Sequence, residues 1–471
     1  MRSEKLGMIK KLVIISLIMG MTHNGLLGAQ ESGQAPMRIS PDEAVNLAIK
    51  NNLILESARV SNATRKRASD YSWNQFVPSV TISGAFTFDN EKPPPPISIA
   101  NPMTGEELFK IETPRWGLAF PIQTSLNLSM AMFENMNRLK LDYQGGLISY
   151  EKAKLQLERD LRKAYNSMLL LQENISLLKD NIAAAERRME MARANYRAGL
   201  SPELMYLQTQ VAVENLKPII DQAENGLLIS MASFAMNLGL PYDTQFELLP
   251  VESDINFISL DVQELVRKAA TGKPDIQELR HNILLLQSVR KTQSNALLPS
   301  LNLSWGITPY TTPPIETMNR TIGGWGKTGS LTIALGLRLH SLFPFVQDRQ
   351  GIKDIDDMIA STNIGLSQLI QGTEIEIYNI VLSLNKTQIT AESQAQTIRL
   401  AERSYQLTEQ AYRAGLQDLL QVQNAELELE QAKLSMLEQQ FNYLNGILDL
   451  EYSIGVPYGT ILPRTSVSGT D

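Results

Sequence analysis

Cysteine is absent from the 471-residue chain, and histidine occurs only three times. Without cysteine there is no disulfide, no thiolate metal site and no N-terminal cysteine for lipid modification. Beyond the first 29 residues the remaining histidines are His281 and His340, far apart in the sequence. No other constellation of residues indicates a hydrolase. We therefore expect no metal, no cofactor, no catalytic residue and no enzymatic activity.

Long apolar runs are also lacking after Gln30, so no segment there has the length that a membrane-spanning helix needs. The apolar run 12–21 follows four basic residues and precedes small residues at Gly28 and Ala29. This pattern is typical of a secretory signal peptide, predicted for residues 1–29. A retained membrane anchor is disfavoured because the run is short. The exported chain is then either soluble or a membrane protein built from strands.

Positive charge is in deficit. The net charge is −7, and removing residues 1–29 takes away four basic residues and one acidic residue, leaving −10. Because phosphate backbones attract basic surfaces, nucleic acid is not an expected partner.

The most informative feature that is present is an internal repeat. The sequence Tyr-Arg-Ala-Gly-Leu occurs at 196–200 and at 412–416, and Gly-Leu-Pro-Tyr at 239–242 returns as Gly-Val-Pro-Tyr at 455–458. Both pairs have the same offset of 216 residues. Val-Pro-Ser at 77–79 likewise matches Leu-Pro-Ser at 298–300. The chain is therefore read as a tandem duplication.

We predict a first repeat over residues 30–245, an irregular linker at 246–257, a second repeat over 258–461 and a tail at 462–471. Each repeat is expected to contain a short helix, a strand, a loop, a strand, a long helix, a sharp turn and a second helix. The first short helix has a start signal, with Ser40 as N-cap and Pro41 in the first turn.

Four segments alternate between apolar and polar residues, which is the period-two pattern of a strand with one apolar face. The apolar positions are Val80, Ile82, Phe86 and Phe88; Trp116, Leu118, Phe120, Ile122, Leu126, Leu128, Met130 and Met132; Leu301, Leu303, Trp305 and Ile307; and Trp325, Leu331, Ile333, Leu335, Leu337 and Leu339. Such strands are typical of transmembrane barrels, although a half-buried soluble sheet shows the same alternation. Trp116, Trp305 and Trp325 are expected near strand ends, at the membrane interface. The proline-rich segments 93–96 and 311–314 are expected as exposed loops.

Four strands cannot close a barrel, because known barrels have at least about 8 strands and an open edge in lipid leaves backbone groups unpaired. At least two copies, and three in the interpretation that we favour, must pool their strands.

Long helices are predicted after each second strand. Apolar residues from Ala164 to Tyr196 recur at steps of three and four, as in coiled coils. A helix over about 138–197 is predicted. In the second repeat the outgoing helix is less regular, with polar residues at Thr387, Gln394 and Thr408.

Gly199 and Gly415 stand where each long helix must end and reverse, which suits the left-handed conformation of a helix C-terminus. Ser201 is expected to cap the next helix with Pro202 in its first turn, and Asp418 to cap the corresponding helix of the second repeat.

These features together resemble the TolC-like outer membrane efflux protein family. The resemblance covers about residues 38–460 and is carried by the repeat, the strand starts at Pro78 and Pro299, the Tyr-Arg-Ala-Gly-Leu turns and the Gly-Leu-Pro and Gly-Val-Pro helix ends. It implies an α+β membrane protein: a homotrimer with a 12-stranded outer-membrane β-barrel, four strands per chain, continued by a long 12-helix periplasmic α-barrel.

The resemblance also implies a function and sites. The chain would be a passive exit duct in a tripartite efflux or type I secretion system, in contact with outer-membrane lipid, a periplasmic adaptor (membrane fusion) protein and an inner-membrane efflux or ABC-type pump. The residues expected at the periplasmic tip, where the adaptor binds, are Tyr196, Arg197, Gly199, Leu200, Tyr412, Arg413, Gly415 and Leu416.

The sequence departs from the family at the entrance constriction. Some members carry acidic residues six and nine positions after the second glycine and an arginine two positions after it. Here those positions hold Gln417, Gln421 and Asn424. An acidic, cation-binding entrance is therefore not expected. The alternative function is a periplasmic coiled-coil scaffold or adaptor without a pore.

Overall fold

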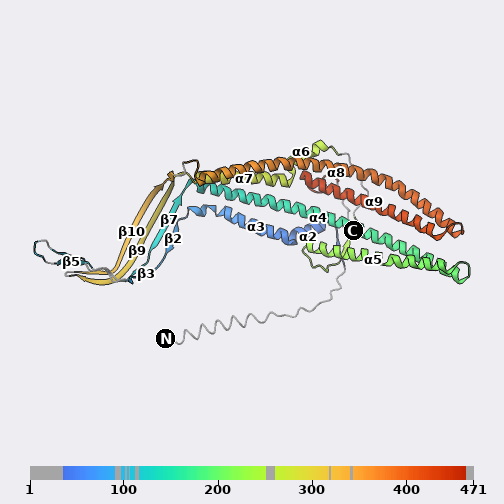
Figure 1. The fold of residues 1–471 in the computed structure, drawn as a ribbon, viewed down its shortest axis with the longest axis horizontal. Coiled ribbons are helices and arrows are strands. Elements are labelled where there is room, and N and C mark those ends of the chain that lie inside the picture. Colours follow the sequence, from blue (N-terminus) through green and yellow to red (C-terminus); the bar gives the residue numbers. More distant parts are fainter. Residues whose placement is uncertain are drawn as a thin grey trace, which may run out of the picture.

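The computed structural model describes residues 36–90, 97–100, 103–105, 107–111, 116–250, 260–317, 320–339 and 343–462. The predicted signal peptide at 1–29, the proline-rich segment 93–96 and His340 lie outside these residues. The molecule is elongated, with a β-sheet at one end and the turns of two long helical hairpins together at the other (Figure 1).

Each half of the chain begins with two short helices where one was predicted. The first half has α2 (Pro41–Asn51) and α3 (Leu53–Asp70), followed by the short 3-10 helix η1 (Ser72–Phe76). Ser40 forms the predicted N-cap, in a capping box with Glu43. The break between α2 and α3 arises because Asn52 is extended and its side chain accepts hydrogen bonds from the backbone of Ile54 and Leu55. The second half has α6 (Val262–Gly272) and α7 (Pro274–Asn295), separated at Lys273.

The main sheet is antiparallel. Its elements are β2 (Ser79–Ile82), β3 (Ala85–Phe88), β6 (Trp116–Ala119), β7 (Ile122–Leu128), β9 (Ser300–Thr317) and β10 (Arg320–Gly336). β2 pairs with β7 and β3 pairs with β6, both β6 and β7 pair with β9, and β9 pairs with β10. β2 and β3 form one strand run, and β6 and β7 form another. Both runs are interrupted near Pro121, whose carbonyl oxygen accepts a hydrogen bond from Ser83 N at 3.1 Å. The sheet thus consists of four antiparallel strand runs.

Three strand predictions were wrong. Leu337 and Leu339 were predicted on the last strand, but β10 ends at Gly336. Met130 and Met132 belong to the helix α4 and not to the preceding strand, because pairing with β9 ends at Leu128 and Ser129 becomes the N-cap. Residues 311–314 lie within β9 and do not form a loop. A hairpin of β4 (Ile97–Ala100) and β5 (Glu107–Ile111) forms a separate pair.

The long helices are α4 (Met130–Arg197), α5 (Glu203–Asn237), α8 (Gln347–Arg413) and α9 (Leu419–Ile454). The 68 residues of α4 correspond to about 100 Å at 1.5 Å per residue. The prediction of a helix over 138–197 is confirmed, and the helix begins eight residues earlier. No helix in the described part of the chain has the length and apolarity required to cross a membrane.

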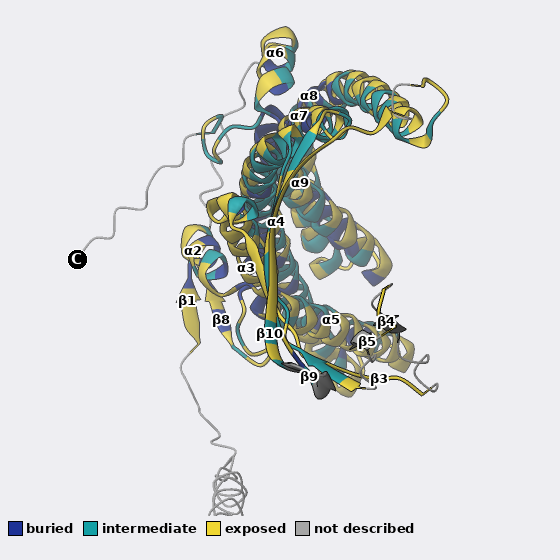
Figure 2. Cartoon of the chain, turned by 90° about the vertical axis from the view of Figure 1, so that its left-hand side faces the viewer, coloured by how far each residue is buried: buried dark blue, intermediate teal, exposed yellow. Residues whose placement is uncertain are grey.

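Two separate hydrophobic clusters lie where the short and long helices meet. One is built from α2, α4, α5 and the parallel pair β1 (Met37–Ile39) and β8 (Phe246–Leu248), around Tyr165 and Phe234. The other is built from α6, α8 and α9, around Ile377 and Tyr443. The fully buried members of each cluster come from one half of the chain, and Figure 2 shows β10 in the sheet as mostly exposed. β8 occupies the start of the predicted linker at 246–257, and residues 251–259 lie outside the described ones.

Glycine makes the same close crossing in both halves. Gly239 and Gly455 follow α5 and α9 with φ near +70°, and each packs on the end of the opening helix of its own half. A Cβ atom at Gly239 would lie 2.4 Å from the Asn51 carbonyl oxygen, and one at Gly455 would lie 2.0 Å from that of Gly272. These are the helix-end motifs that revealed the repeat.

Candidate functional site at the helix tips

The two hairpin turns have the same backbone geometry. Gly199 and Gly415 both have φ +72°, in the left-handed region predicted for them. Leu200 N donates to Asn195 O at 2.9 Å, and Leu416 N donates to Ala411 O at 2.8 Å. Each glycine N–H also donates to the carbonyl of the tyrosine three residues earlier, at 2.9 Å. Both turns are therefore Schellman motifs, which satisfy the carbonyl groups that a helix end leaves unpaired.

The helices after the two turns start differently. Asp418 is the N-cap of α9 and accepts from Gln421 N at 3.0 Å, as predicted. In the first repeat Pro202 is itself the N-cap of α5, without a side-chain hydrogen bond, so the prediction that Ser201 caps this helix was wrong. Ser201 Oγ is buried and has no hydrogen-bond partner among the described residues.

Each tip exposes a pair of leucines at equivalent positions. Leu200 and Leu416 are 78% and 79% exposed, and Leu204 and Leu420 are exposed one turn further along. Because an isolated helix turn gains nothing from exposed apolar side chains, two such pairs at one end of the molecule favour an interaction surface.

The tips differ in aromatic contacts and in charge. Tyr196 stacks on Tyr206 across the first hairpin, with ring centroids 6.4 Å apart, whereas the position equivalent to Tyr206 in α9 is the buried Val422. Arg413 forms an ion pair with Glu409 at 2.7 Å. Arg197, at the equivalent position, is exposed and makes no ion pair within the described residues.

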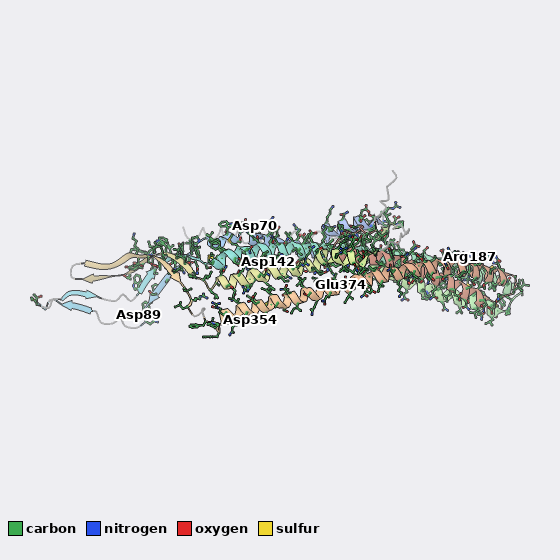
Figure 3. The ribbon with its side chains drawn as sticks, turned by 90° about the horizontal axis from the view of Figure 1, so that it is seen from above. Asp70, Asp89, Asp142, Arg187, Asp354 and Glu374 are labelled. Atoms are coloured by element: carbon green, nitrogen blue, oxygen red, sulfur yellow. The ribbon has the colours of Figure 1, made fainter. Side chains whose placement is uncertain are left out.

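The residues expected at the entrance constriction lie at and just after the second turn. Gln417 is in the turn, and Gln421 and Asn424 are in the first two turns of α9, all three exposed. Their uncharged side chains are available to solvent in a single chain. Figure 3 shows this end of the helices beyond Arg187, opposite the end where Asp89 follows β3.

The three tryptophans expected at the membrane interface all lie in the sheet. Trp116 is the first residue of β6, as predicted. Trp305 and Trp325 each lie five residues inside their strand, because β9 and β10 are longer than the alternation indicated. Trp325 stacks on Phe120, with ring centroids 6.3 Å apart, and all three indoles are exposed.

Sequence reasoning missed a buried charged cluster near the tips. Arg188 of α4 forms a two-pronged ion pair with Glu426 of α9, and the Nη1–Oε1 distance is 2.9 Å. Both side chains are about 10% exposed. Arg188 stands three residues after Ala185 and four before Ala192, both buried, so a charge within the apolar stripe was the available signal.

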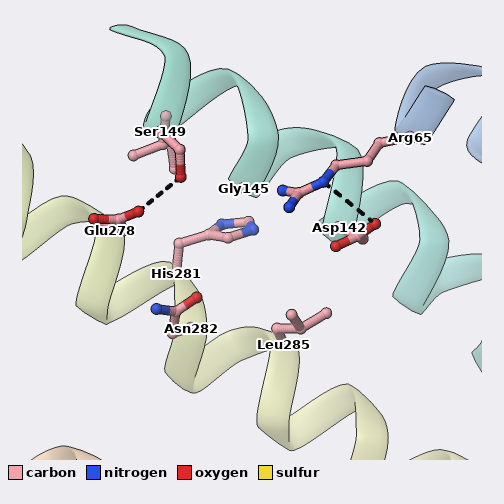
Figure 4. Close-up of a pocket in the computed structure, with 9 residues that line it drawn as sticks. Arg65, Asp142, Gly145, Ser149, Glu278, His281, Asn282 and Leu285 are labelled. Carbon is pink, nitrogen blue, oxygen red and sulfur yellow. Dashed lines mark hydrogen bonds and ion pairs between the residues drawn. The ribbon is translucent and has the colours of Figure 1, made fainter. Parts of the chain in front are cut away.

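A cavity of about 220 Å³ lies between α3, α4 and α7 (Figure 4). His281 Nε2 donates to Leu141 O at 2.7 Å, and Ser149 donates to Glu278 at 2.7 Å. The ring of His281 packs on Gly145, where a Cβ atom would lie 2.9 Å from His281 Cδ2. These hydrogen bonds link α4 to α7 and provide partners for the polar groups of His281, Ser149 and Glu278. Within the described ranges, no cluster of three or more side chains suits a metal ion.

Comparisons with known proteins agree with this architecture. Residues 44–239 match the family described as outer membrane efflux protein. Nodulation protein T of Rhizobium leguminosarum bv. trifolii is 21% identical over 401 residues, which cover 82% of this chain and 79% of that protein.

Two solved structures have a similar fold. CusC, described for its transmembrane channel formation, has a TM-score of 0.70 at 14% identity, over 88% of this chain and 92% of that chain. The outer membrane channel CmeC of Campylobacter jejuni has a TM-score of 0.67 at 15% identity, over 88% of this chain and 85% of that chain. Residues 44–239 therefore match the outer membrane efflux protein family, and the chain as a whole shares the fold of solved outer-membrane channels.

Proposed function

We propose that the chain is one of three identical subunits of an outer-membrane channel, a passive exit duct without enzymatic activity. The observation that supports this most directly is the incomplete sheet. Within the described residues β2 and β3 pair only on one side, with β7 and β6, and β10 pairs only with β9. One face of these strands carries exposed apolar side chains, such as Ile82, Ile333 and Leu335.

Pairing between copies removes the two open edges. Each unpaired backbone N–H or C=O group in lipid costs several kcal/mol, so the four strand runs are stable in a membrane only when neighbouring copies continue the sheet. Three copies give a closed barrel of about 12 strands, within the range of known barrels. The apolar side chains then face lipid, and the tryptophans contact its interface.

The long helices support the same assembly. Ile375, Leu382 and Ile389 of α8 are exposed at intervals of seven residues. A seven-residue apolar repeat is the seam of a coiled coil and calls for a partner helix. With three copies, the four long helices of each chain form a 12-helix tunnel below the barrel.

At the tips we infer contacts with a periplasmic adaptor protein, which would couple the duct to an inner-membrane efflux or ABC-type pump. The residues proposed for this contact are Tyr196, Arg197, Gly199, Leu200, Tyr412, Arg413, Gly415 and Leu416. The exposed leucine pairs support an apolar contact there. Gln417, Gln421 and Asn424 would line an uncharged entrance, which favours ions of neither sign.

Two neighbouring substitutions test which face of the sheet meets lipid. Ile333→Arg places a charge on the apolar face, where an arginine at the bilayer midplane costs about 2–4 kcal/mol. Thr332→Arg places the same charge on the opposite face. We expect Ile333→Arg to reduce the amount of assembled protein in outer membranes, with Thr332→Arg assembling as the native chain does. Equal behaviour of the two variants would contradict a lipid-facing apolar surface.

The alternative, a periplasmic scaffold without a pore, is not favoured. It requires a water-soluble chain, whereas the family is an outer-membrane one and the sheet exposes apolar side chains on a continuous face. Single-channel recording in planar bilayers separates the two functions. The proposed channel conducts, and a scaffold does not.

A further inference from the structure

The contact between the two halves of the chain differs from the contacts within each half. Each half has its own hydrophobic cluster. Where α4 of the first half meets α9 of the second, polar side chains pair along the antiparallel helices. The pairs are Gln156 with Tyr452, Lys163 with Asp449, Asn166 with Asn445, Asn181 with Glu430 and Arg188 with Glu426.

The last two pairs form the part of this seam that lies closest to the tips. Arg188 lies nine residues before the end of α4, about 13 Å along the helix. One turn of α9 separates Glu426 from Glu430, and Asn181 Nδ2 donates to Glu430 Oε2 at 2.5 Å. The guanidinium of Arg188 also interacts with the hydroxyl of Tyr405 on α8.

Two carboxylates in this cluster lie beside one guanidinium. From α9, Glu430 meets Glu426 and Lys433, and from α4 it meets Arg188 and Asn181. Tyr405 of α8 lies near Glu426 and Glu409. Arg188 is already committed to both oxygens of Glu426, so within the described residues Glu430 forms no ion pair, and Lys433 acts on it only through its longer-range charge.

We propose that Arg188, Glu426 and Glu430 form a proton-sensitive clasp, which holds the α4–α5 and α8–α9 hairpins together while Glu430 is protonated and loosens them when it ionises. The clasp itself is a property of the seam. Its effect on the entrance of a channel rests on the proposed function.

Burial, followed by the neighbouring charge of Glu426, raises the pKa of Glu430 to about 7, against the opposing effects of Arg188, Lys433 and Asn181. Because the pKa of Glu430 is higher in the clasped state than in the splayed state, protonation of Glu430 stabilises the clasped state at pH values below about 7. When the hairpins separate and water reaches Glu430, its pKa returns toward the usual 4.5. The clasp is therefore weakened as the pH rises from about 4.5 to 7 and above.

The size of the effect follows from one linked proton per subunit. With a pKa of about 7 in the clasped state and about 4.5 in the splayed state, the splayed-to-clasped ratio rises about 30-fold per subunit between about pH 5.5 and 8.5. Three subunits that respond together would amplify this change.

The experiment uses the full processed chain in lipid. Because the chain has no cysteine, Gln210→Cys on α5 and Gln406→Cys on α8, both exposed, provide the only thiols for spin labels. Double electron–electron resonance then measures the distance between hairpins from about pH 5.5 to 8.5. We expect the distance to increase as the pH rises across this range.

Three variants make the test specific. Glu430→Gln keeps an acceptor for Asn181 but cannot ionise, so the distance should no longer depend on pH. Glu426→Gln removes the neighbouring charge and frees Arg188 for Glu430, so the midpoint should fall by about 1 pH unit. Glu224→Gln is the matched control, because Glu224 pairs with Lys179 within one hairpin, at 2.7 Å, and its loss should leave the midpoint unchanged.

The clasp is overturned if the native distance is independent of pH or if Glu430→Gln retains the transition. Current through planar bilayers, recorded on the same proteins, separates this outcome from failure of the proposed function. A pH-dependent distance without current would support the clasp and contradict the channel. Current together with a pH-independent distance would support the channel and contradict the clasp.

Discussion

Replacing Gly455 by alanine tests the account of how the long hairpins are fixed to the rest of each repeat. Gly455 has φ +70°, and alanine in the left-handed region costs about 1–2 kcal/mol. In addition, its Cβ atom would lie 2.0 Å from the carbonyl oxygen of Gly272, so the end of α9 and the end of α6 must move apart. Such overpacking costs about 1–3 kcal/mol, which gives a total of about 2–5 kcal/mol.

Substitutions at two other glycines separate the cost of the backbone strain from the cost of the close approach. Gly415→Ala at the tip imposes the same backbone strain, since φ is +72°, but its Cβ atom would meet nothing within 4 Å. Gly272→Ala has no positive φ, and its Cβ atom would lie 2.2 Å from Ile454 O. The first therefore measures the strain alone, and the second the close approach.

The measurement is the loss of helical circular dichroism with denaturant, for the native protein and the three variants in detergent. Gly415→Ala should cost about 1–2 kcal/mol and Gly455→Ala clearly more. The reasoning is refuted if Gly415→Ala destabilises the protein as much as Gly455→Ala, because the crossing with α6 would then contribute nothing.

Three further predictions concern the C-terminal turn, the helix junction and the tips. Glu451 is fully buried and accepts hydrogen bonds from two backbone N–H groups of the turn that follows α9, both at 2.9 Å. Glu451→Ala should therefore lower the free energy of unfolding in denaturant by about 2–4 kcal/mol. As a control, Glu438→Ala at an exposed position should lower it by less than about 0.5 kcal/mol. Burial raises the pKa of Asp275, but Lys152, which binds it at 2.7 Å, outweighs this and leaves the pKa below its usual value. This ion pair therefore contributes stability above about pH 4 that is lost as the pH falls further, and unfolding of Lys152→Met at several pH values should lack that part of the acid sensitivity. Gly415→Pro should impair export measured in cells while oligomers still assemble; normal export with an assembled variant would contradict the assignment of the tip.

Local features of the sequence predicted the parts of the fold that local chemistry determines. Gly199 and Gly415 end their helices because the left-handed conformation suits glycine, and Ser40 and Asp418 cap helices through their own side chains. The order of the elements followed from the repeat.

Features that depend on distant segments were not predicted. The length of β9 is set by pairing with β10, which carries the strand through the prolines at 309, 313 and 314. The pairing of Arg188 with Glu426 depends on how α4 and α9 align across 238 residues, which periodicity within either helix does not determine. The family resemblance located the tips, but the partners of their side chains came from the packing of the helices.

The most direct test of the account is the mass of the processed protein after extraction of outer membranes with detergent, measured by native mass spectrometry. The unpaired sheet edges require neighbouring copies, so we expect three chains in one particle that detergent releases and salt does not. A monomer that is recovered in water without detergent would contradict the central claim, because four strand runs with an exposed apolar face would then be stable alone.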